Sequence, residues 1–151
     1  MNITIRPALK TDCPRMMELI RELAHYEKAP EQVTVSMEHF ENSGFGQQPI
    51  WWAIVAEMDD RVEGFALYYI RYSTWKGQRM YLEDILVTEA MRGKGAGALL
   101  MNELMKIARQ KNLNGITWQV LNWNEPAIRF YQKIDGIRMD PEWVNVMLDF
   151  E

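Results

Sequence analysis

Hydrophobic positions in the first third of the chain change from a strand pattern to a helical one. Ile3 and Ile5 alternate with polar residues before Pro7, which predicts a short strand. Apolar residues then recur at helical spacing through residues 11–26, with Thr11 or Asp12 as the expected N-cap. A second, shorter helix is expected at residues 36–42, before a glycine-containing loop.

From position 50 the pattern becomes that of strands. Aromatic and β-branched residues dominate three segments, 51–58, 62–71 and 78–87, and turn residues separate them, so we expect an antiparallel meander. The remaining pattern predicts, in order, a helix from residue 98, a strand at 115–121, a helix from residue 124 and a closing strand at 143–150. The expected class is mixed α/β. No repeat or linker is visible, and one domain, residues 1–151, is expected.

Composition narrows the function. The net charge of −4 argues against nucleic acid, because phosphate binding needs a concentrated basic surface, and it favours a cationic ligand weakly. One cysteine and two histidines do not supply a metal cluster or an internal disulfide. No apolar stretch approaches the roughly 18 residues of a membrane span, and the first residues lack a signal-peptide core. We therefore expect a cytoplasmic protein without metal, membrane or nucleic-acid partners.

The strongest chemical feature is a glycine-rich segment between a predicted strand and a predicted helix. It reads Arg92-Gly93-Lys94-Gly95-Ala96-Gly97. Glycines let backbone amides approach an anion closely, and the start of a helix adds the positive end of its dipole. The segment therefore suits a pyrophosphate.

Three interpretations of this segment remain at this point. It is a solvated basic turn, a dinucleotide-binding loop or a loop for the pyrophosphate of coenzyme A. The segment fits G-x-G-x-x-A, but it lies late in the chain, and the next predicted strand ends without the acid that a dinucleotide site needs. A P-loop is excluded because no Gly-Lys-Ser/Thr is present.

The pattern Arg92-x-x-Gly95-x-Gly97 resembles the signature of the GNAT superfamily of N-acetyltransferases, and the predicted order of elements is similar to that of the superfamily. The resemblance narrows to the diamine acetyltransferase group, which includes spermidine/spermine and thialysine acetyltransferases. It is carried over nearly the whole chain by these segments: Ile5-Arg6-Pro7-Ala8, Glu22-Leu23-Ala24-His25-Tyr26-Glu27, Gly44-Phe45-Gly46, Tyr81-Leu82-Glu83-Asp84, and Trp123-Asn124-Glu125-Pro126 followed by Phe130-Tyr131.

This resemblance implies a GNAT fold, with a central mixed, mostly antiparallel sheet flanked by helices. It also implies acetyl-coenzyme A as the acyl donor, direct transfer in a ternary complex, and a homodimer. The residues implied to hold the donor are Ile85, Leu86, Val87, Arg92, Gly93, Lys94, Gly95, Ala96, Gly97, Ala98, Asn124, Pro126 and Ala127.

An amine that attacks a thioester must first lose its proton, because free alkylamines have a pKa of about 10. Glu83 and Asp84 interrupt an apolar strand, where an acid is costly unless it is used. Adjacent strand residues point to opposite faces, so we expect one of the two to face the cleft. The resemblance makes Glu83 that residue, binding the substrate ammonium and removing its proton, with Asp84 in a structural or secondary role. The alternative is a pair of surface carboxylates.

The resemblance implies three further roles. Tyr131 would give a proton to the sulfur of coenzyme A, and the alternative for it is core packing. Tyr26 and Glu27 match a pair that contacts the substrate, although a solvated helix end explains them equally well. Trp75 would line the amine channel by cation–π contact or lie at a dimer contact.

Ser73 stands where polyamine-acetylating members are expected to carry an acid, which favours a thialysine-like amino acid or short amine over spermidine and spermine. The expected function is acetyl transfer to a small cationic amine. The rival functions are acetylation of a protein N-terminus or lysine, and a catalytically weak module that binds acetyl-coenzyme A.

Overall fold

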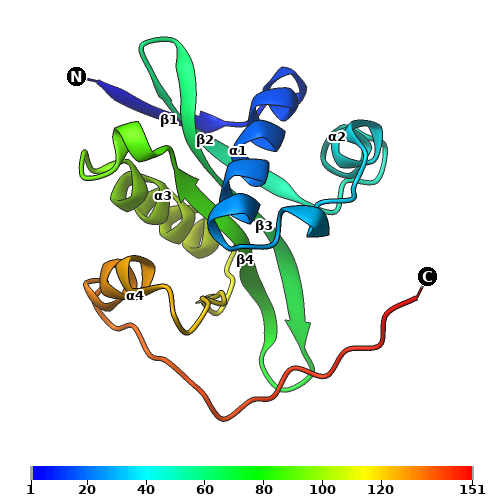
Figure 1. Cartoon of the computed structure of the whole chain (residues 1–151). Coiled ribbons are helices and arrows are strands. Elements are labelled where there is room, and N and C mark those ends of the chain that lie inside the picture. The colour runs from blue at the N-terminus through cyan, green and yellow to red at the C-terminus, as the bar shows by residue number, and fades with distance from the viewer. Residues whose placement is uncertain (1, 151) are drawn as a thin grey trace. The chain divides into compact units, whose positions relative to one another are not determined.

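A computed structural model describes residues 2–150 (Figure 1). The strands are β1 (Ile3–Pro7), β2 (Trp52–Met58), β3 (Arg61–Ser73), β4 (Gly77–Val87) and β5 (Ile116–Thr117). The helices are α1 (Cys13–Tyr26), α2 (Met37–Phe45), α3 (Ala96–Gln110) and α4 (Glu125–Gln132), with short 3-10 turns η1 (Lys10–Asp12), η2 (Pro30–Gln32) and η3 (Glu89–Met91). The predicted helices and the meander are confirmed, with ends shifted by a few residues.

The five strands form one mixed sheet in the order β1-β2-β3-β4-β5. The first four pair antiparallel, and β5 joins β4 in parallel through only two residue pairs, Met80–Ile116 and Tyr81–Thr117. The pairing register shifts at two places. One shift lies between β2 and β3 at Ala56 and Glu57, and the other lies between β3 and β4 at Leu67 and Tyr68. The expected mixed, mostly antiparallel sheet is therefore confirmed.

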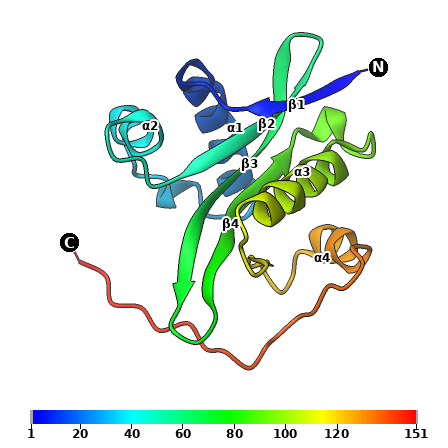
Figure 2. The same ribbon diagram turned by 180° about the vertical axis from the view of Figure 1, so that it is seen from behind.

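Helices cover both faces of this sheet (Figures 1 and 2). On one face, α1 places Met16 and Leu19 in a buried cluster with Phe65 and Leu67 of β3. On the other face, α3 packs against β3 and β4 and buries Leu100 and Leu104. Successive side chains of β3 therefore pack alternately against α1 and against α3, because side chains along a strand point to opposite faces in turn.

The chain divides into two compact units, Met1–Trp118 and Gln119–Glu151. The first contains the whole sheet with α1, α2 and α3, and the second contains α4. Within residues 2–150, no helix combines the length and apolar character needed to cross a membrane.

Two predicted strands differ in the structure: one is shorter than expected and the other is not formed. The strand expected at 115–121 is reduced to β5, because pairing with β4 stops at Thr117. Residues 143–150 form no strand in the described part of the chain, although their apolar side chains suit one. A strand needs a partner for its backbone hydrogen bonds, and β-propensity without a partner is not sufficient.

A half-buried charge network joins β1 to the start of α1. The guanidinium of Arg6 donates to both carboxylate oxygens of Asp12, at 2.8 and 3.1 Å, and to Glu57 of β2 at 2.7 Å. Asp12 also accepts the amide of Leu9 at 2.7 Å. Burial alone raises the pKa of Asp12, but the bonds from Arg6 and the Leu9 amide reverse the effect and lower that pKa.

Replacing Arg6 with alanine leaves the buried Asp12 carboxylate without its bidentate partner. We expect the free energy of unfolding at pH 7 to fall by about 2 kcal/mol, measured by urea denaturation. Arg61→Ala is the control, because Arg61 is exposed and pairs only with Glu63 at 3.5 Å. Equal losses for the two variants would contradict a special role for the Arg6 network.

Candidate active site

The glycine segment joins η3 to α3 in a conformation that requires glycine. Gly93 has a φ of 78° and Gly95 a φ of 90°, which L side chains rarely adopt. Gly95 is the N-cap of α3 and has no side chain that could accept a hydrogen bond from the first amides of the helix. The first backbone hydrogen bond of the helix runs from the Leu99 amide to the Gly95 carbonyl, at 3.0 Å. The amides of Ala96, Gly97 and Ala98 precede it and remain available to an anion.

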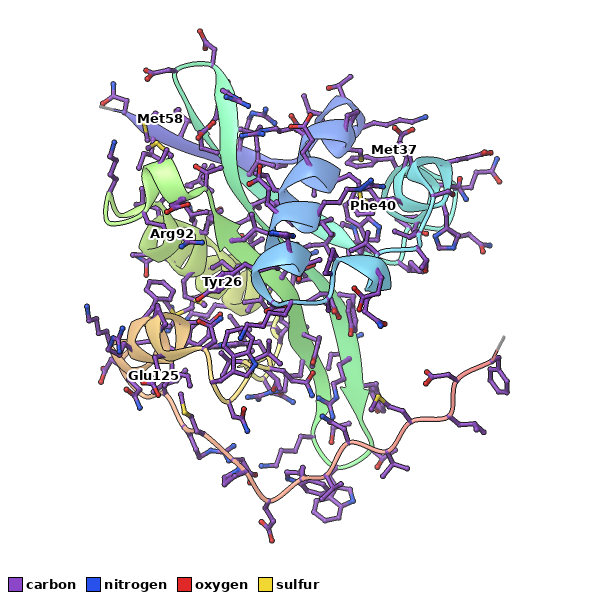
Figure 3. The ribbon with its side chains drawn as sticks, viewed as in Figure 1. Tyr26, Met37, Phe40, Met58, Arg92 and Glu125 are labelled. Atoms are coloured by element: carbon purple, nitrogen blue, oxygen red, sulfur yellow. The ribbon has the colours of Figure 1, made fainter. Side chains whose placement is uncertain are left out.

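Charge and an aromatic side chain border these amides. Arg92 and Lys94 are exposed on the segment. The Arg92 guanidinium lies 5.7 Å from the ring centre of Tyr26, over its face, and Figure 3 labels both residues. This contact ties the glycine segment to the end of α1. The structure thus brings Tyr26 to the predicted donor-binding loop.

β4 offers main-chain groups next to that loop. Ile85, Leu86 and Val87 pair with β3 on one edge of β4, whereas the ladder to β5 ends at Tyr81. In the sheet of the described residues, the other edge of β4 has no strand partner from Leu82 onward. An open strand edge binds an extended amide-containing chain through backbone hydrogen bonds.

An extra residue in β4 controls where its two acids point. Leu82 pairs with Tyr68 and Asp84 pairs with Leu67, so Glu83 is a bulge without a partner. Paired residues share a face of the sheet, and Asp84 therefore lies on the face of Leu67, which α1 covers.

Glu83 points to the same face. Its carboxylate accepts a hydrogen bond of 3.1 Å from the Tyr69 hydroxyl, and Tyr69 lies two residues from Leu67 on that face. Burial and the negative charge of Glu83 raise the pKa of Tyr69 to about 12, so its phenol stays a donor. The expectation that Glu83 and Asp84 point to opposite faces is therefore wrong, because the bulge breaks the alternation.

The end of α1 adds a third carboxylate. Glu27 is the C-cap of α1, where the helix dipole disfavours a negative charge, and burial raises its pKa. Burial first, and then the charges of Glu83 and Glu27, raise the pKa of Asp84 to about 6. We call Glu27, Glu83 and Asp84 the acidic group.

No lysine or arginine neutralises the acidic group among the ion pairs of residues 2–150. Within residues 2–150, no group of three or more His, Cys, Asp or Glu side chains is placed to hold a metal ion. Like charges left together are unfavourable unless a cation joins them. The arrangement therefore suits a cationic ligand.

The second unit carries the remaining predicted residues. Asn124 caps α4 by accepting the Ala127 amide at 3.3 Å, and Pro126 occupies the first turn, as expected. Tyr131 is buried, with 8% of its surface exposed, and its ring lies 5.6 Å from that of Phe130. Their roles toward a ligand stay predictions.

The structure does not bring Trp75 to the acidic group. Trp75 lies in the turn between β3 and β4 and is 92% exposed. Six strand residues, about 20 Å, separate Gly77 from Glu83. Ser73 fixes this turn, since its hydroxyl accepts the amides of Trp75 and Lys76 at 3.1 Å. The structure therefore does not support a role for Trp75 in lining the amine channel of its own chain. A role for Trp75 in a dimer contact stays a prediction.

Sequence reasoning missed the residues that extend this face along the hairpin. Tyr69 stacks on Tyr81, with ring centres 5.2 Å apart, and Arg71 lies over Tyr81 at 5.7 Å. The alternation of β3 places Leu67, Tyr69 and Arg71 on one face, and this signal was available from the sequence.

The pKa of Asp84 gives a dependence of stability on pH. The folded state binds the proton more tightly than the unfolded chain, so Asp84 favours the folded state below its unfolded pKa of about 4 and loses that contribution as pH rises through about 6. Replacing Asp84 with asparagine should therefore stabilise the fold more at pH 7 than at pH 4.5, by a difference on the order of 2 kcal/mol in urea denaturation. A difference independent of pH would contradict the raised pKa.

Comparison with known proteins agrees with this geometry. The family model for the Acetyltransferase (GNAT) family matches residues 13–137. A thialysine N-epsilon-acetyltransferase of Bos taurus is 39% identical over 87% of this chain and 82% of its own length. A human spermidine/spermine N(1)-acetyltransferase-like protein 1 is 33% identical over 91% of this chain and 21% of its own length.

Among solved structures, an integron cassette protein from the mobile metagenome of V. cholerae superposes with a TM-score of 0.80. It is 28% identical, and the match covers 99% of this chain and 94% of that one. The expected fold is thereby confirmed. Together with the family match over most of the sequence, these similarities show that the chain belongs to the GNAT family of acetyltransferases.

Proposed function

We propose that this GNAT acetyltransferase transfers an acetyl group from acetyl-coenzyme A to the side-chain amine of a thialysine-like amino acid or a short diamine. The observation that carries the acceptor is the acidic group, three carboxylates on one face without a lysine or arginine partner among the described residues. The similarity to thialysine acetyltransferases supports the same class of substrate.

The residues present fit the donor. Acetyl-coenzyme A supplies the activated thioester. The amides of Ala96, Gly97 and Ala98 would hold its pyrophosphate, with Arg92 and Lys94 adding charge. The open edge at Ile85, Leu86 and Val87 would hold the pantetheine arm. Asn124, Pro126 and Ala127 complete the proposed binding residues.

The acceptor amine would bind as a cation and react as a neutral nucleophile. Glu27 and Asp84 attract the ammonium group, and Glu83 accepts its proton, directly or through water. The Tyr69 hydroxyl bond holds the Glu83 carboxylate in place. Tyr26, which contacts Arg92, would close the acceptor site next to the donor loop.

Tyr131 is proposed to return a proton to the departing thiolate. Its place on α4, one residue after Phe130 in the segment that begins at Asn124, supports this role, as does its burial, which limits competition from water. No covalent enzyme intermediate is required, because the amine itself is the nucleophile.

We also propose that residues 1–151 act as one catalytic domain, because the family model spans both compact units. A homodimer is proposed, since Trp75 and the apolar residues of 143–150 are exposed and suit burial by a partner. A single, buried Cys13 fits a cytoplasmic location.

Release of free thiol from acetyl-coenzyme A tests the proposal. The panel is thialysine, lysine, ornithine, putrescine, spermidine and spermine, and we expect turnover with the amino acids and short diamines. In Tyr131→Phe, turnover should fall about 100-fold because the thiolate loses its proton donor. Acetyl-coenzyme A should raise the melting temperature of the variant as it does that of wild type, and NAD should raise neither. Undiminished turnover would remove Tyr131 from the mechanism, and turnover only with peptides would replace the proposed acceptor.

Replacing Glu83 with glutamine removes the proposed proton acceptor but keeps the size of the side chain. We expect kcat/KM to fall about 100-fold and the pH–rate profile to change, because the glutamine amide cannot accept the proton of the amine. Glu38→Gln is the matched control, since Glu38 is exposed on α2. If the pH–rate profile of Glu83→Gln matched that of wild type and of Glu38→Gln, another group would be the proton acceptor.

A further inference from the structure

A line of contacts leads from the acidic group along the hairpin to a guanidinium. The Glu83 carboxylate bonds the Tyr69 hydroxyl at 3.1 Å, Tyr69 stacks on Tyr81 at 5.2 Å, and Arg71 lies over Tyr81 at 5.7 Å. The face therefore carries negative charge, then two aromatic rings, then positive charge. Such a sequence of groups complements a ligand with an amine at one end and an anion at the other.

Two arginines pair across the hairpin on this face, and they differ in what they bind. Arg79 of β4 donates to Thr117 and to both oxygens of Asn114, which fixes β5 against β4. Arg71 of β3 is exposed, and its contact in the described chain is with the Tyr81 ring, not with a carboxylate. A cation–π contact of this kind leaves the guanidinium able to donate N–H bonds to a carboxylate.

Building on the proposed function, we propose that Arg71 binds the α-carboxylate of the acceptor and thereby selects an amino acid over a diamine or polyamine. Its fork of donors matches a carboxylate in a bidentate manner. Tyr69 and Arg71 lie two positions apart on one face of β3, with about 7 Å between their Cα atoms, so the hydroxyl that binds Glu83 and the guanidinium come from neighbouring side chains of the same face.

The same positive charge acts against the alternative substrates. A diamine keeps an ammonium group at this end but lacks the carboxylate that offsets its charge beside Arg71, so Arg71 repels it. Ser73, on the same face two residues further along β3, provides no carboxylate to compensate, and its hydroxyl is used by the hairpin turn. Discrimination thus combines attraction of one ligand class with repulsion of the other.

Matched ligand pairs test this role, because lysine differs from cadaverine, and ornithine from putrescine, only in the α-carboxylate. Dissociation constants and thiol-release kinetics are measured for each pair with wild type, Arg71→Gln and Arg71→Glu. In Arg71→Gln we expect lysine to bind about tenfold more weakly, through KM and not kcat, with cadaverine nearly unchanged. In Arg71→Glu the preference should reverse in favour of cadaverine.

Arg109→Gln is the control, since Arg109 is an exposed arginine on α3, which packs on the opposite face of the sheet. It should leave both ratios as in wild type. An unchanged lysine-to-cadaverine ratio of dissociation constants in both Arg71 variants overturns the proposal. Absence of turnover with every amine would defeat the proposed function, and the binding ratio would still decide the role of Arg71.

Discussion

The extra residue in β4 is the constraint on which the arrangement of charge depends. A regular strand would send Glu83 and Asp84 to opposite faces, and one of them would enter the core beneath α3. The bulge turns both toward α1 and leaves Leu82 on the other face, buried with Met80. The sheet keeps its packing while two carboxylates join Glu27 at the end of a helix.

β4 can carry this irregularity because it is held unequally along its two edges. β3 pairs with β4 along its whole length except at Glu83, whereas β5 pairs only at Met80 and Tyr81, where Arg79 reinforces the junction. Beyond that point the outer edge of β4 is open, and the strand runs on through η3 to the glycine segment. One strand thus presents acids on its face and main-chain groups on its edge, and it leads to the start of a helix. The proposed donor and acceptor sites are therefore neighbours.

Much of the fold follows from periodicity. The apolar spacing of α1 and α3 and the β-branched strands of the meander have one arrangement that buries them, so their prediction succeeds. The bulge is different, because Leu82, Ile85 and Leu86 are apolar and satisfy either register. For this reason the sequence does not reveal that Asp84 lies on the same face as Glu83. The failure at residues 143–150 has another cause, since side-chain pattern does not say whether a partner strand exists.

The place of Arg71 and Ser73 in an exposed hairpin has a consequence for the evolution of this enzyme. Substitutions at exposed positions rarely change stability by more than about 0.5 kcal/mol. The hairpin end of the face, which we propose to bind the acceptor, can therefore change without destabilising the buried part of β4 that leads to the proposed donor site. Substitutions in this hairpin would therefore change the proposed acceptor while the fold and the proposed donor site stay intact.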